Sequence, residues 1–173
     1  MKEPITLGLL RDTAAIRDLC ERSGEWEAMR ADDEPSIGEV PWNILCDDPK
    51  HSAWLGVWKG RHLVGAFLFI NVGGDIAEVH TLMTRECRGR DAVQAGKMAL
   101  VVAFSKPLFG GRPLQSIISN CPATNHAASH YAAAVGFGFQ TRYPLAWVKH
   151  GERHDLLQWG LNKHQFEEQL CRS

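Results

Sequence analysis

The apolar and polar residues of this chain follow two periods, close to two in some runs and close to 3.6 in others. The runs "SAWLGVWKG" at 52–60 and "HLVGAFLFINV" at 62–72 have the character of strands, and the Gly60-Arg61 pair between them is a hairpin signal. The run "RDTAAIRDLCERSG" at 11–24 predicts an amphipathic helix that Asp12 or Thr13 caps and Gly24 ends.

The same patterns predict the other elements. We expect further strands at 5–10, 75–83 and 114–120 and on both sides of the "HGER" turn, and further helices up to about 107, at 125–135 and, capped by Asn162, near the C-terminus. Residues 25–50 predict a loop and a short helix over one face of the core. This order of elements predicts an α/β protein with a mixed sheet and helices on both faces.

Composition narrows the class of protein. The chain has 173 residues, of which 45% are hydrophobic and 23% are charged, and it has no repeat or linker, so we expect one domain spanning 1–173. The formal charge of −1 provides no global field for a polyanion, so we expect no nucleic-acid or membrane partner. No apolar run approaches the roughly 18 residues of a membrane span.

Cysteine usage indicates a reducing compartment. The five cysteines are odd in number, widely spaced and without a CxxC pair, which is typical of reduced thiols. We therefore expect a cytoplasmic protein without a zinc site. His126 and His130 lie one helical turn apart, but no third ligand accompanies them, so we expect no metal. Cys121 lacks a visible His partner, and we expect an inert thiol.

The segment "TRECRGRDAV" at 84–93 raises the question of a phosphate site. A basic, glycine-containing loop before a helix can hold phosphate on the amides of the first helical turn. Arg85, Arg88 and Arg90 outnumber Glu86 and Asp91, which leaves a local charge of +1. Asp91 is expected at the N-cap, where its carboxylate would compete for the same amides. A phosphate loop and a plainly capped core helix both remain open.

Two segments resemble the GNAT superfamily of acyl-CoA-dependent N-acetyltransferases. The loop with Arg88, Gly89 and Arg90 is similar to that family's pyrophosphate loop, although Asp91 and Val93 depart from its glycine and small-residue positions. "NHAASHYAAAVGF" at 125–137 keeps the register of a second family segment over a full helix. The family's tyrosine position falls on Ala132, and the neighbouring Tyr131 would point about 100° away.

The resemblance implies a GNAT-like fold: a mostly antiparallel sheet with a splayed parallel pair that holds the pantetheine arm. It also implies acetyl-CoA as cofactor. The residues expected to bind it are Leu82, Met83, Arg88, Gly89, Arg90, Asp91, Ala92, Val93, Asn120, Asn125, Ala128 and Tyr131. Tyr131 is the candidate proton donor to the departing thiolate, with a packing role as the alternative.

Glu78 and His80 are the candidate bases. They lie two residues apart on the strand entering the loop, so they share a face of the sheet and either could take the amine proton through water. A solvent-facing polar stripe beside the buried Val79, Thr81 and Met83 is the alternative. The acidic residues from Glu25 to Asp48 either line an amine entrance or only solubilise the surface.

The predicted function is transfer of acetyl from acetyl-CoA to a primary amine of a protein, peptide or small molecule, without a covalent enzyme intermediate. The alternative is a catalytically degenerate GNAT-fold binding or assembly protein, for example a bacteriophage virion-assembly component, which Asp91, Val93 and Ala132 favour. A homodimer surface at Trp26 or Trp42 also stays open.

Overall fold

The computed structural model describes residues 3–172, without the side chains of Met29, Asn43 and Asp47. In this part of the chain the strands are β1 (Ile5–Leu9), β2 (Ser52–Lys59), β3 (His62–Gly73), β4 (Ile76–Met83), β5 (Ser116–Pro122), β6 (Gly138–Lys149) and β7 (Glu152–Asn162). The helices are α1 (Thr13–Ser23), α2 (Glu25–Met29), α3 (Trp42–Asp47), α4 (Arg90–Ser105), α5 (His126–Val135) and α6 (Lys163–Arg172). The one short helix expected in 25–50 is therefore two.

All seven strands form one sheet in the order β1-β2-β3-β4-β5-β7-β6. Every neighbouring pair is antiparallel except β4 and β5, which are parallel because α4 crosses over between them. The predicted mixed α/β class, mostly antiparallel with one parallel pair, is confirmed.

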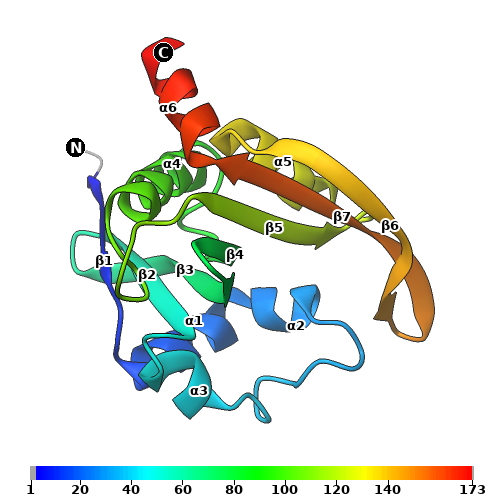
Figure 1. Ribbon diagram of the computed structural model, residues 1–173. Coiled ribbons are helices and arrows are strands. Elements are labelled where there is room, and N and C mark those ends of the chain that lie inside the picture. The colour runs from blue at the N-terminus through cyan, green and yellow to red at the C-terminus, as the bar shows by residue number, and fades with distance from the viewer. Residues whose placement is uncertain (1–2, 173) are drawn as a thin grey trace.

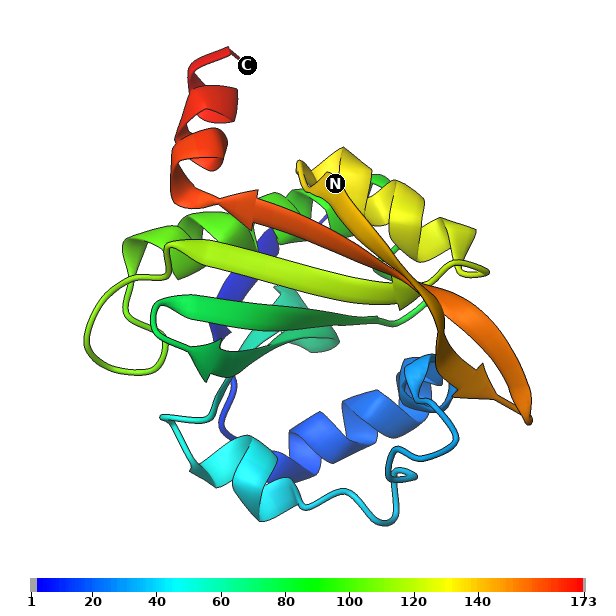
Figure 2. The ribbon, with the colours of Figure 1, turned by 45° about the vertical axis from the view of Figure 1, so that its right-hand side comes forward.

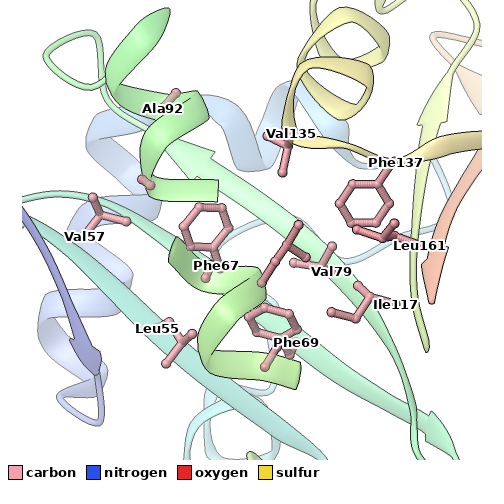
Figure 3. Close-up of a cluster of buried hydrophobic side chains, with 14 of the residues drawn as sticks. Leu55, Val57, Phe67, Phe69, Val79, Ala92, Ile117, Val135, Phe137 and Leu161 are labelled. Atoms are coloured by element: carbon pink, nitrogen blue, oxygen red, sulfur yellow. The ribbon is translucent and has the colours of Figure 1, made fainter. Parts of the chain in front are cut away.

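Helices cover both faces of the sheet (Figure 1). α4, α5 and α6 bury residues such as Leu100, Val135 and Phe166 against one face, and α1 buries Ile16 and Leu19 against the other. Alternation along the strands sorts their side chains between the two cores, as a period of two requires. Figure 3 shows the first core, where aromatic and aliphatic residues of β3, β4, β5 and β7 meet α4 and α5.

The helix caps follow the expected chemistry at both ends of the chain. The Asp12 carboxylate accepts hydrogen bonds from the N–H groups of Ala14 and Ala15 at 3.0 and 3.1 Å. At α6, Asn162 and Gln165 accept from each other's backbone N–H, which is a reciprocal capping box. Asp12 and Asn162 were both predicted as caps, and both are confirmed.

The hairpin of β6 and β7 reaches beyond β5 and bends toward α2 (Figures 1 and 2). Its tip is fixed there by hydrogen bonds to the segment after α2. Asp32 accepts from the backbone N–H groups of His150 at 3.0 Å and Gly151 at 2.8 Å, and Lys149 Nζ donates to the carbonyls of Glu27 at 2.6 Å and Arg30 at 2.9 Å. Hydrogen bonds therefore join the tip of the hairpin to the segment after α2.

Candidate active site

The parallel pair β4 and β5 separates along its length. The two strands are in register only at Ile76 with Ser116, Ala77 with Ile117 and Glu78 with Ile118. Beyond these positions β4 stays paired with β3 and β5 stays paired with β7, but in the described residues the two strands no longer pair with each other. The splayed parallel pair that the resemblance implied is thus present.

A cavity of about 720 Å³ lies at this gap, a size typical of small-molecule sites. On one side it is lined by α4 and α5, with Gly96, Ala128, Tyr131 and Ala132 among the lining residues. On the other side the lining comes from the α2–α3 segment and the β6–β7 hairpin, including Trp26, Pro35, Ile44, Trp147 and Leu156. The cavity therefore joins the two faces of the sheet through the gap.

Glu78 and His80 lie where the strands begin to separate, and both line the cavity. His80 Nε2 is 3.6 Å from Glu78 Oε1, and Asn120 Nδ2 on β5 donates to the same carboxylate oxygen at 3.0 Å. The side chains of Glu78 and His80 are 23% and 33% exposed, so neither is a fully solvated stripe. Their predicted common face is confirmed.

Asn120 is itself held by a chain of hydrogen bonds across three strands. Gln158 Nε2 on β7 donates to Asn120 Oδ1 at 3.3 Å, and the Tyr143 hydroxyl on β6 donates to Gln158 Oε1 at 3.5 Å. Each donor points toward Glu78, so the chain fixes the orientation of both amides and of the carboxylate. We call these three residues, Asn120, Gln158 and Tyr143, the amide relay.

The expected N-cap role of Asp91 is wrong. α4 begins at Arg90 with Gly89 at the N-cap (φ 60°), and no side chain caps that end. Asp91 instead forms an ion pair with Lys59 of β2, with Asp91 Oδ2 2.7 Å from Lys59 Nζ. Both side chains are largely buried, with 11% and 18% exposed, and Lys59 also donates to the carbonyl of Glu86. The hydrogen bond that Lys59 donates to the Asp91 carboxylate raises the pKa of Lys59 above its ordinary value.

This pairing changes the electrostatics expected for the loop. Lys59 offsets the carboxylate that would oppose a phosphate, and the carboxylate is turned toward β2 instead of across the helix start. Arg88 is partly neutralised by Glu25, 2.7 Å away, while Arg85 and Arg90 are exposed. The Val93 N–H donates to the Gly89 carbonyl at 3.1 Å, in the normal pattern of a helical first turn.

Tyr131 lies between α5 and α4 and lines the cavity. Its hydroxyl donates to the Ala92 carbonyl at 3.3 Å. Burial raises the pKa of Tyr131 well above its ordinary value, although a hydrogen bond with Thr81 opposes the shift. A Cβ on Gly96 would lie 2.5 Å from the Tyr131 hydroxyl, so this glycine makes room for the ring.

The other predicted residues divide into two groups. Leu82, Asn120, Asn125 and Ala128 line the cavity, and Asn125 caps α5 by accepting from the Ala128 N–H at 3.0 Å. Met83 is buried in the core, and residues 88–93 are not among the lining residues. The structure therefore brings the base candidates, Tyr131 and the second segment together, and the start of α4 meets them through the hydrogen bond from Tyr131 to the Ala92 carbonyl.

Several residues of the site had no sequence signal. Lys59, Gln158 and Trp147 became part of it only through strand pairing and the bend of the hairpin.

In residues 3–172 no group of three metal-ligating side chains occurs. None of the helices in that range has both the length and the apolar character needed to cross a bilayer.

The fold is similar to that of solved N-acetyltransferase structures. The chain is similar to the spermidine N-acetyltransferase from Vibrio cholerae in complex with CoA and spermine, with a TM-score of 0.76 and 18% identity over 94% of this chain and 98% of that one. It is also similar to an N-acetyltransferase from Staphylococcus aureus Mu50, with a TM-score of 0.71 and 11% identity over 92% and 97%. No protein-family model and no curated protein sequence matches the chain.

Proposed function

We propose that this protein transfers an acetyl group from acetyl-CoA to a primary amine by direct attack. The observation that carries the proposal is the cavity that crosses the sheet at the splayed β4–β5 pair, with Glu78 and His80 at the crossing. A similar fold in a spermidine N-acetyltransferase structure with CoA supports it.

The residues present fit coenzyme A. At Gly89, where φ is positive, an added Cβ would meet nothing within 4 Å, so the backbone before α4 is open to a close approach. Residues 88–93 would hold the pyrophosphate at the start of α4, with Arg85 and Arg90 adding positive charge. The gap between β4 and β5 would take the pantetheine arm. When bound, acetyl-CoA supplies the thioester that carries the acetyl group.

The protein's own groups supply positioning and proton transfer. Glu78 or His80 would take a proton from the incoming ammonium, directly or through one water. The amide relay holds Glu78 in place, so the orientation of the base is set before the amine arrives. The Tyr131 hydroxyl, which donates to the Ala92 carbonyl here, would serve as the proton donor to the departing thiolate.

The test measures binding first and turnover second. A ligand at 100 times its Kd stabilises a protein by about 2.7 kcal/mol, so saturating acetyl-CoA should raise the Tm by several degrees. Free thiol released in the presence of an amine panel then reports transfer. Glu78→Gln should keep the Tm shift and lose most of the thiol release.

An unchanged Tm at large excess of acetyl-CoA would overturn the proposal. A Tm shift without thiol release for any amine would instead support the alternative of a GNAT-fold binding protein that has lost turnover. Ala132, at the position of the family's tyrosine, is the residue that favours that alternative.

A further inference from the structure

The acceptor side of the cavity is a chamber with two walls. One wall is the segment after α2 and the other is the β6–β7 hairpin, and the Asp32 and Lys149 hydrogen bonds described above join them. The Asp32 N–H also donates to the Val148 carbonyl at 2.9 Å. Because five hydrogen bonds, one of them between backbone groups, tie the walls together, the shape of the chamber is set before a substrate enters.

The side chains that these walls present are mostly flat and apolar. Trp26 and Trp147 line the chamber from different walls, with Pro35, Ile44 and Leu156 beside them. The Trp26 indole N–H donates to the Pro35 carbonyl at 3.2 Å, so its polar atom is already used. Trp147 lies against the His154 ring with centroids 5.7 Å apart. Aromatic walls of this kind favour a planar apolar ligand body.

Charged side chains line both the walls of the chamber and the strand gap. The acidic, basic and histidine side chains there are Arg30, Asp33, Glu34, His51, Glu78 and His80, and the cavity also has Cys121 and Tyr131 among its lining residues. Of the three carboxylates, Asp33 and Glu34 are exposed at the rim, where water screens them. Glu78 is the partly buried one, beside the gap that would hold the thioester.

Glu34 and Arg30, two of the charged residues of the walls, already form hydrogen bonds within the segment after α2. Glu34 accepts from the Ala31 N–H at 2.7 Å through its carboxylate. Arg30 donates to Glu27 at 2.6 Å and to the Glu34 carbonyl at 3.0 Å. A substrate carboxylate would therefore meet a guanidinium that is already engaged, and a second ammonium would meet only screened carboxylates.

We infer that the acceptor is an amphiphilic monoamine: one primary amine that reaches Glu78, attached through a short linker to a flat apolar body between Trp26 and Trp147. This inference rests on the proposed function. It sets the chain apart from the similar Vibrio cholerae structure, which was described with spermine.

Three probe amines separate the classes. 2-Phenylethylamine has one ammonium and an aromatic body, phenylalanine adds a carboxylate to the same body, and spermidine has several ammonium groups and no aromatic body. With saturating acetyl-CoA we expect kcat/KM for 2-phenylethylamine to exceed the other two by at least about tenfold, which corresponds to about 1.4 kcal/mol. A preference for spermidine or phenylalanine would overturn the inference.

A matched pair of variants on one strand tests the chamber itself. Trp147→Ala should lower kcat/KM for 2-phenylethylamine about tenfold or more, mainly through KM, and leave the Tm shift with acetyl-CoA unchanged. Leu145→Ala is the control, because Leu145 is 55% exposed on the same strand and is not among the lining residues. An equal loss in both variants, or none in Trp147→Ala, would contradict a role for the chamber.

Failure of the proposed function would look different. If acetyl-CoA does not change the Tm, acetyl transfer is excluded, and the Tm shifts produced by 2-phenylethylamine and spermidine alone then decide the inference. A larger shift with 2-phenylethylamine, lost in Trp147→Ala, supports the chamber as an amine site. A larger shift with spermidine overturns it.

Discussion

Replacing Lys59 with methionine should destabilise the fold and weaken coenzyme binding together. Lys59→Met keeps the apolar stem of the side chain but leaves the Asp91 carboxylate without its cation at 2.7 Å. Breaking a fully buried pair costs about 3–5 kcal/mol, and a hydrogen bond to a charged group is worth about 1.5–3 kcal/mol. Since 18% and 11% of the two side chains are exposed, we expect a loss of about 2–3 kcal/mol.

For a chain of this length that loss corresponds to a Tm lower by roughly 4–12 °C. Urea unfolding and calorimetry measure it directly. The matched control is Arg88→Met, which breaks the ion pair between Arg88 and Glu25. This pair is also 2.7 Å long, but the Arg88 side chain is 57% exposed. That substitution should cost less than about 1 kcal/mol, because exposed pairs contribute little.

The prediction for coenzyme binding differs between the two partners of the ion pair. An uncompensated carboxylate about 6 Å from a phosphate, at an effective dielectric near 40, opposes binding by about 1.4 kcal/mol, or tenfold. Lys59→Met should therefore weaken acetyl-CoA binding about tenfold, whereas Asp91→Asn, which removes the charge and leaves Lys59, should not weaken it. A stable Lys59→Met protein with unchanged affinity would refute the reasoning.

Three further predictions concern other contacts. Gly96→Ala places a Cβ 2.5 Å from the Tyr131 hydroxyl, so it should cost about 1–3 kcal/mol in urea unfolding and lower kcat. Gln158→Leu removes the donor that holds Asn120, so it should lower kcat and alter the pH profile of kcat. Gln158→Glu keeps an acceptor for the Tyr143 hydroxyl but lacks the donor to Asn120, so it should not restore kcat. Asp32→Asn should speed amide hydrogen exchange at the hairpin tip while leaving the core amides unchanged, because an amide cannot accept from both N–H groups as the carboxylate does.

The Asp32 contacts also predict a pH dependence. Backbone N–H groups of Gly151 and His150 hold the pKa of Asp32 below its ordinary value of 3.8. A lowered pKa in the folded state contributes stability above the ordinary value, and this stability is lost as the pH falls through the lowered one. The protection of the tip amides, measured as exchange relative to the intrinsic rate at each pH, should therefore fall below about pH 4 in the native protein and change less in Asp32→Asn.

Unaltered unfolding of Gly96→Ala would contradict close packing of Tyr131. An unchanged pH profile of kcat in Gln158→Leu would mean that the amide relay has only a structural role. Equal exchange at the tip in the native protein and Asp32→Asn would mean that other contacts hold the hairpin.

The hydrophobic pattern was sufficient to predict most of the helices and strands, because each of them has its own local period. β2 and β3 were predicted within a residue of their observed bounds, and Asp12 and Asn162 were predicted as caps from local sequence. The face shared by Glu78 and His80 follows from the same period of two.

Contacts between residues far apart in the sequence could not be predicted from the local pattern. Asp91 looks like an N-cap when only its neighbours are considered, but a cation on β2, which becomes a neighbour only through the fold, turns its carboxylate aside. Gln158 lies opposite Asn120 because β5 and β7 pair in that register. Trp147 reaches the chamber because the hairpin bends and its tip is fixed 118 residues away along the chain, at Asp32.

The short register between β4 and β5 makes the sheet into two plates, β1 to β4 and β5 to β6, joined at one end by three residue pairs. A ligand between the separated ends of β4 and β5 would replace the hydrogen bonds that the two strands do not form there and would hold the two plates together. Its binding free energy would then add to the stability of the folded protein. The free protein should therefore begin to unfold between β4 and β5, and the liganded protein should not.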